Sequence, residues 1–237
     1  MRTRMLFLVS AVVAAVVCVS PTSAGDPAAH AQVPETGAKT AHQEALKALA
    51  IILPRDNLSH HPLDDEIARR WLHGFIDALD PQRLYFTAGD VQRFARRGED
   101  LADHARRGDL AFAEFVRNVH AWRLGRTAKW GDALLNQNHD FTVDEHFELR
   151  PAEFAADVAA LRQRWRKRIK YDILVEKSAG HRTDKALAKL RARYRRIARD
   201  RQIGNAELYE IFLDSLARAY GPNNAYLGQR SLQAFRL

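Results

Sequence analysis

Four serines follow the first 24 residues of the sequence, and each is a candidate nucleophile. They are Ser59, Ser178, Ser215 and Ser231. A catalytic serine needs a general base and an oxyanion site, and Gly-x-Ser-x-Gly and Ser-x-x-Lys are two sequence patterns in which such serines occur. None of the four stands in either pattern. We therefore predict no catalytic residue in this chain, and we interpret Ser215 as a helix residue that bonds back to its own backbone.

Histidines and carboxylates gather in one segment, His139-Asp140 followed by Asp144-Glu145-His146. These side chains offer nitrogen and oxygen ligands, but their spacing matches no His-Glu-x-x-His motif, and histidines in loops usually face solvent. The acidic run Asp64-Asp65-Glu66 suits the first turn of a helix, where the helix dipole stabilises negative charge. No Gly-x-Gly-x-x-Gly or Walker motif is present. We predict no metal site and no cofactor.

Arginine is concentrated in two runs, 162–170 and 191–201, within a chain that has 37 Lys and Arg residues against 29 Asp and Glu residues. The formal charge is +8, and Trp165, Tyr171 and Tyr194 are interleaved with the basic residues, as in many nucleic-acid-binding proteins. We favour solvated helix faces over a nucleic-acid site, because the N-terminal segment predicts export. An anionic membrane surface and an acidic protein partner both stay open.

The first 24 residues have the layout of a secretory signal peptide. Two arginines precede an apolar run over residues 5–19, which is short for a transmembrane helix, and small residues lead to a cleavage site after Ala24. A site after Ala31 is the alternative. The only cysteine, Cys18, lies inside the apolar run, so the processed chain would form no disulfide and no thiolate metal site. We expect a periplasmic or secreted protein.

Helical periodicity then dominates the chain. Residues 25–41 are rich in Ala, Pro, Gly, Thr and Gln and are predicted to be a flexible lead. Beyond them, apolar side chains recur every three or four residues, which predicts an all-α domain over 42–237, an irregular bundle of about seven helices. Alternating residues near 141–149 indicate one short extended segment. The expected helices are 46–53, 63–79, 87–101, 109–135, 151–173, 183–202 and 205–219, with Pro54 ending the first.

A structural corner is predicted at Leu79-Asp80-Pro81-Gln82-Arg83-Leu84-Tyr85-Phe86. Asp80-Pro81 ends a helix and turns the chain, two aromatic rings return towards the core, and Thr87 caps the next helix. With Asp90 and Phe94, this string resembles the N-terminal helical region of tail-specific proteases, the carboxy-terminal processing serine peptidases of the bacterial periplasm. Segments 139–145, 165–174 and 212–227 occur in the same order as in that family.

The resemblance implies structural roles for eleven residues and catalytic roles for none. One departure concerns Gly221-Pro222-Asn223-Asn224, where the family usually carries an Asp-Pro-His-Thr-like string and this chain keeps only the proline. The motif residues are Leu79, Asp80, Pro81, Arg83, Tyr85, Phe86, Asp90, Trp165, Lys170, Pro222 and Tyr226.

The family's PDZ domain would begin near the end of this sequence, so its PDZ and Ser/Lys catalytic domains are expected to be absent. We therefore expect the N-terminal scaffold of a periplasmic tail-specific serine peptidase, inactive alone. Three origins stay open: a truncated gene, which we favour, a fragment of a longer protease, and a stand-alone helical protein that kept only the scaffold. The whole protease, by resemblance, would cut exported proteins with apolar C-terminal tails. The expected partners are the missing PDZ and protease domains. The alternative is a non-enzymatic periplasmic module that binds a partner protein or an anionic membrane surface.

Overall fold

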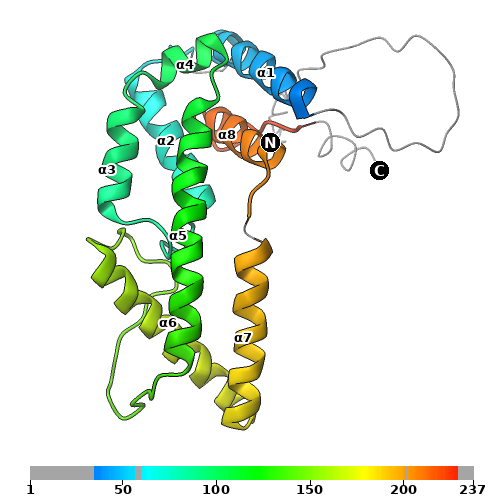
Figure 1. The fold of residues 1–237 in the computed structure, drawn as a ribbon. Helices are drawn as coiled ribbons and strands as arrows, with labels where there is room; N and C mark the ends of the chain where they lie inside the picture. The colour runs from blue at the N-terminus through cyan, green and yellow to red at the C-terminus, as the bar shows by residue number, and fades with distance from the viewer. Residues whose placement is uncertain (1–34, 57–59, 201, 229–237) are drawn as a thin grey trace, which may run out of the picture.

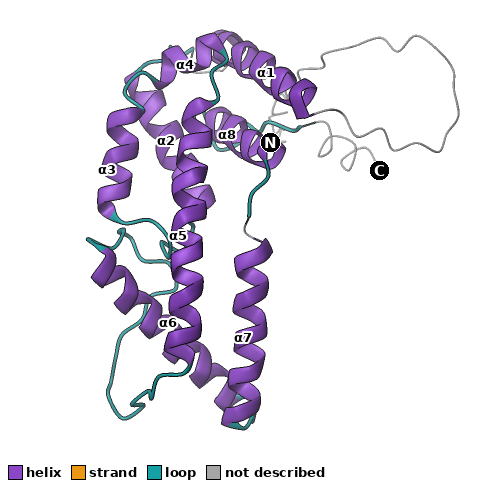
Figure 2. Cartoon of the chain, viewed as in Figure 1, coloured by secondary structure: helices purple, strands orange, loops and turns teal. Residues whose placement is uncertain are grey.

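The protein is seen in a computed structural model that describes residues 35–56, 60–200 and 202–228. Within these ranges the chain forms eight α-helices and no strand, which confirms the all-α prediction (Figures 1 and 2). In the same ranges no helix is long and apolar enough to cross a membrane. The helices are α1 (Glu35–Asp56), α2 (Asp65–Leu79), α3 (Ala88–Arg97), α4 (Leu101–Arg107), α5 (Ala111–Leu135), α6 (Val158–Ser178), α7 (Thr183–Asp200) and α8 (Asn205–Ala219).

The eighth helix arises because one predicted helix is two. Gly98 ends α3, with its N–H donating to the carbonyls of Phe94 and Ala95, and α4 starts at Leu101. Gly108 ends α4 with φ +70, a conformation that favours glycine. A Cβ there would lie 2.7 Å from the carbonyl oxygen of Gln43 in α1. The close packing of this turn on α1 therefore also requires a residue without a side chain.

The flexible lead predicted over 25–41 is wrong for residues 35–41, which are helical in α1. Residues 35–41 show no apolar periodicity, but a tertiary contact supports them as a helix: Lys39 Nζ lies 2.7 Å from Glu114 Oε1 of α5. Pro54 also does not end the helix, because it lies in the last turn of α1. The predicted signal peptide and cleavage site at Ala24 lie outside the described residues.

The extended segment predicted near 141–149 is also wrong, because these residues form a loop. Side chains of α6 hold the loop in place of a strand ladder: Lys170 Nζ donates to the carbonyl of Val143 and to Glu145. Helix α6 begins at Val158, seven residues after Pro151, because Asp157 caps it by accepting the N–H of Ala160 at 2.8 Å.

The helices enclose two apolar cores, and α5 belongs to both. The first core joins α1, α2, α3, α4, α8 and the beginning of α5, where Phe112 and Val116 are buried. The second core joins α6, α7 and the end of α5, where Leu134 and Leu135 are buried. In Figure 1, α5 runs past both groups, with α6 and α7 beside its C-terminal half. The corner after α2 lies where the two cores meet.

Candidate functional site

The corner, residues 80–87, is organised by the carboxylate of Asp80. This residue is fully buried at the end of α2. Its Oδ1 accepts the backbone N–H of Leu84 at 2.8 Å, and its Oδ2 accepts those of Tyr85 and Phe86 at 2.9 Å each. Three backbone donors compensate the desolvation of the charge, and the carboxylate in turn supplies acceptors for a buried turn. Leu79 is buried beside it, whereas Pro81 is exposed.

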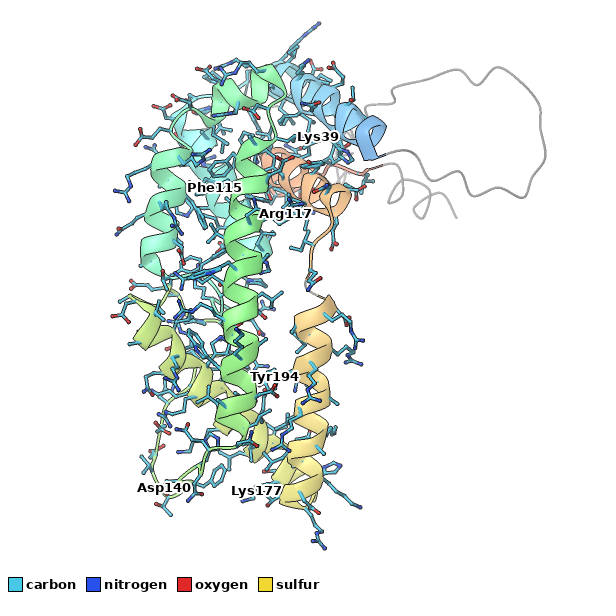
Figure 3. The ribbon with its side chains drawn as sticks, viewed as in Figure 1. Lys39, Phe115, Arg117, Asp140, Lys177 and Tyr194 are labelled. Carbon is cyan, nitrogen blue, oxygen red and sulfur yellow. The ribbon has the colours of Figure 1, made fainter. Side chains whose placement is uncertain are left out.

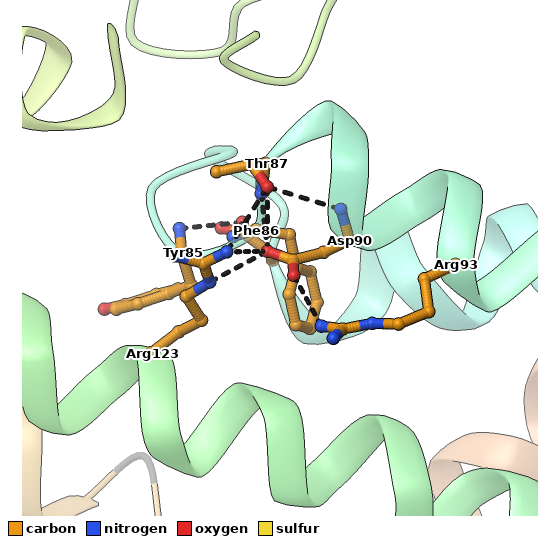
Figure 4. Close-up of polar contacts among 7 residues, drawn as sticks. Tyr85, Phe86, Thr87, Asp90, Arg93 and Arg123 are labelled. Atoms are coloured by element: carbon orange, nitrogen blue, oxygen red, sulfur yellow. Dashed lines mark hydrogen bonds and ion pairs between the residues drawn. The ribbon is translucent and has the colours of Figure 1, made fainter. Parts of the chain in front are cut away.

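A capping box continues the corner into α3. Thr87 Oγ1 accepts the N–H of Asp90, and Asp90 Oδ2 accepts the N–H of Thr87 at 3.0 Å. Two arginines then bind the same carboxylate: Arg123 Nε of α5 donates to Oδ2 at 2.8 Å, and Arg93 Nη2 of α3 to Oδ1 at 2.8 Å (Figure 4). Arg123 and Asp90 are both buried, so the contact is a desolvated ion pair between α3 and α5.

Aromatic residues connect the corner to both cores. The indole Nε1 of Trp165 in α6 donates to the carbonyl of Leu84 at 2.6 Å. The ring of Tyr85 packs edge-on against Trp165, with centroids 6.2 Å apart. Phe86 packs instead against Phe94 of the first core, at 5.1 Å. Successive residues of the corner therefore enter different cores.

Arg83 ties the outer side of the corner to the segment before α6. It adopts φ +51, and its Nη1 donates to the carbonyl of Pro151 at 2.6 Å. Arg164 of α6 donates to the carbonyl of Arg83 at 2.9 Å. The backbone at Arg83 is thus held in a left-handed conformation by polar contacts on both of its sides.

Lys170 belongs to a second group, the loop anchor, which consists of Glu145, Arg166 and Lys170. Lys170 Nζ lies 2.8 Å from Glu145 Oε2, and Arg166 binds both oxygens of the same carboxylate. Hydrogen bonds from Arg166 and then Lys170 lower the pKa of Glu145 to about 2. The loop anchor fixes the loop 141–149, for which the sequence pattern predicted an extended segment.

Pro222 and Tyr226 follow α8, and Tyr226 packs against the first core. The N–H of Tyr226 donates to Asp214 Oδ1 at 3.0 Å, and burial raises the pKa of its hydroxyl. Pro222 is exposed. The predicted residues thus fall into three places: the corner, the loop anchor and this C-terminal segment. The structure brings Asp80, Asp90 and Trp165 together, and it does not bring Lys170 or Tyr226 to them.

Three polar contacts were missed by sequence reasoning. Arg123 is 33 positions from Asp90, and no local pattern links them. Asp172, by contrast, accepts from Arg168 Nε at 3.0 Å and from the hydroxyl of Tyr194, and the four-residue spacing from Arg168 was a usable signal. Burial and the neighbouring Asp172 raise the pKa of Tyr194.

The contacts of Ser215 and of the buried carboxylates hold helices in place. Ser215 Oγ donates to the carbonyl of Ile211 at 2.7 Å, the predicted bond to its own helix. In the part of the chain that the structure describes, no cluster of three or more His, Cys, Asp or Glu residues could hold a metal ion. Ser59 and Ser231 lie outside that part. The buried carboxylates of Asp80 and Asp90 accept hydrogen bonds from backbone N–H groups and, for Asp90, from two arginines, an arrangement that positions helices.

Comparison with known proteins defines the class of this helical domain. A family model described as "Tail specific protease N-terminal domain" matches residues 49–230. The chain therefore belongs to the tail-specific protease N-terminal domain family, as the corner motif indicated. The matched range contains the corner, the loop anchor and the C-terminal segment.

Among curated proteins, the chain is similar to the tail-specific protease of Haemophilus influenzae, with 25% identity over 197 residues. The alignment covers 81% of this chain and 28% of that protein. The chain thus spans little more than a quarter of the length of this relative.

Proposed function

We propose that residues 42–237 are the non-catalytic N-terminal scaffold of a periplasmic tail-specific serine peptidase. The observation that carries this proposal is the corner: the family's motif residues Asp80, Tyr85 and Trp165 form a buried network that joins two cores. Such a network rigidifies the junction of the two cores and so positions the helices around it. The PDZ and protease domains of a longer chain are the proposed partners, and the proposed route to the periplasm is a signal peptide cleaved after Ala24.

An exposed apolar patch supports a role in holding other domains. Of the nine exposed large hydrophobic side chains among the described residues, six lie in the loop 141–149 and on the adjoining face of α6. Clustered apolar exposure of this kind marks an interaction surface more often than scattered exposure does. The patch consists of Phe141, Val143, Leu149, Tyr171, Leu174 and Val175.

The test is the size and the compartment of the native product. An antibody against residues 42–228 would be used to blot periplasmic and cytoplasmic fractions of the native strain, with a strain deleted for the gene as the control. We expect a periplasmic band far above the 26.9 kDa of this sequence, because the relative is much longer than this chain, and such a band would replace the truncated gene favoured from the sequence. A band at or below 26.9 kDa, or a product confined to the cytoplasm, would contradict the proposal.

A further inference from the structure

A cavity of about 250 Å³ opens between α5 and α7, and we name it the α5–α7 groove. Tyr85, Trp165 and Tyr194 line it, and the first two are nearly fully buried, so they form its deep side. Figure 3 labels Tyr194 on α7 beside α5. Two small residues, Ala128 of α5 and Ala198 of α7, also line the groove, and their short side chains leave space between the helices.

The size of the groove limits what it could hold. Pockets for drug-sized ligands and cofactors occupy roughly 300–1,000 Å³. A smaller space with an aromatic lining suits one or two large apolar side chains of a polypeptide. The groove is separate from the exposed patch on α6, because it shares no residue with that patch.

Positive charge surrounds the groove. Helix α7 carries seven basic and two acidic residues. Lys129 and Arg195 line the groove, both are exposed, and among the described residues neither lies within ion-pair distance of a carboxylate. Asp132 is the one acidic residue in the lining. Exposed, unpaired cations beside an apolar slot favour a partner that offers both carboxylates and an apolar anchor.

We propose that the α5–α7 groove binds an acidic polypeptide segment, which inserts one large apolar side chain between Ala128 and Ala198 and pairs its carboxylates with Lys129 and Arg195. A membrane surface fits less well, because a concave slot between two helices accepts a protruding side chain and a bilayer surface presents none. The proposal goes beyond the scaffold role above, because it assigns a ligand to a groove of this domain.

The probe is a fluorescein-labelled peptide of 15 residues in which glutamates surround one Leu-Phe pair, with both ends blocked so that no terminal carboxylate contributes. Binding to the full chain would be measured by fluorescence anisotropy. We expect saturable binding that weakens several-fold between 50 and 300 mM salt, because the Debye length shortens from about 14 Å to about 6 Å. The same peptide with lysine in place of glutamate, or with Ala-Ala in place of Leu-Phe, should bind at least ten-fold more weakly.

Matched variants separate the groove from general charge. Ala128→Trp fills the groove from an exposed position of α5 and should weaken binding at least ten-fold, whereas Ala192→Trp, at an exposed position of α7 outside the lining, should change it less than two-fold. Arg195→Glu should weaken binding more than the same change at the remote, exposed Arg69. Circular dichroism melting of each variant shows that it is folded.

Three results would overturn the proposal. The acidic peptide fails to bind the wild-type chain, or Ala128→Trp and Ala192→Trp bind it equally well, or phosphatidylglycerol vesicles bind in a manner that Ala128→Trp abolishes while the peptide does not bind. The last result would assign the groove to lipid. None of them bears on the size of the native product, so failure here is distinguishable from failure of the scaffold role.

Discussion

Arg123 of α5 lies 2.6 Å from Asp90 of α3, through Nη2 and Oδ2, although the two residues are 33 positions apart. Their side chains are 8% and 4% exposed. The pair lies next to the corner, because Asp90 also accepts the backbone N–H of Thr87. It therefore fixes the middle of α5 against the turn that links the two cores.

Replacing Arg123 should be far more damaging than replacing Arg93, although both bind Asp90. Arg123→Met leaves a buried carboxylate without its buried partner, which costs about 3–5 kcal/mol in such pairs. Arg93 is half exposed, and Arg93→Met should cost less than about 1 kcal/mol. Urea unfolding of the two variants measures both values. Equal losses of unfolding free energy in the two variants would show that burial of the ion pair does not determine its contribution to stability.

The Asp80 carboxylate should be essential to the stability of the corner. Asp80→Asn replaces one acceptor oxygen with a donor that faces backbone N–H groups, and hydrogen bonds to charged groups contribute about 1.5–3 kcal/mol each, so we expect a loss of about 3 kcal/mol or more. Asp77→Asn is the control, because Asp77 is exposed and, among the described residues, its side chain binds only Arg83. A loss below about 1 kcal/mol for Asp80→Asn would contradict this role, since that is the range of exposed pairs.

The indole N–H of Trp165 should contribute beyond its apolar surface. Trp165→Phe keeps an aromatic ring but leaves the carbonyl of Leu84 without this donor, at a cost of about 1–3 kcal/mol for a buried unsatisfied group. Trp122 is 54% exposed, and Trp122→Phe should change the stability by less than about 0.5 kcal/mol. Thermal unfolding followed by circular dichroism compares the two. Similar melting temperatures would argue against the Trp165 bond.

Glu145 should make stability depend on pH in the acid range. Its pKa in the folded protein is lowered from 4.5 to about 2 by Arg166 and Lys170. A lowered pKa means that the unfolded chain takes up the proton first, so the contribution of Glu145 is complete above about pH 4.5 and is lost as the pH falls towards 2. Between pH 5 and pH 3, the wild type should therefore lose more stability than Glu145→Gln does.

The control for this titration is Glu153→Gln, which changes an exposed glutamate that has no ion-pair partner among the residues in view. This variant should keep the wild-type dependence on pH. If Glu145→Gln keeps it as well, the loop anchor does not couple to folding.

Local signals in the sequence predicted most of the helices. The ends of α2 and α8 were predicted closely, because apolar residues with a period near 3.6 reveal the buried face and Asp64 supplies a cap for α2. The errors at 35–41 and at 141–149 share one physical cause. Both segments are held by side chains distant in sequence, through Lys39 with Glu114 and through Lys170 with Glu145, and local periodicity carries no information about such pairs.

The candidate site was predicted in part for the same reason. The string 79–86 identified the corner, because its turn and capping residues act on their immediate neighbours. Arg123 could not be found in this way, since an ion pair over 33 positions depends on how α3 and α5 pack. The α5–α7 groove is likewise a product of helix packing, so its lining residues come from four separate parts of the chain.

The position of α5 has a consequence for how the domain unfolds. Its first turns are buried in one core and its last turns in the other. Melting either core would expose apolar side chains of α5 and loosen the end of α5 that is buried in the other core. Partial unfolding is therefore unfavourable. The two halves should then melt in a single cooperative transition, and the amides in the middle of α5 should exchange with deuterium only when the whole domain opens.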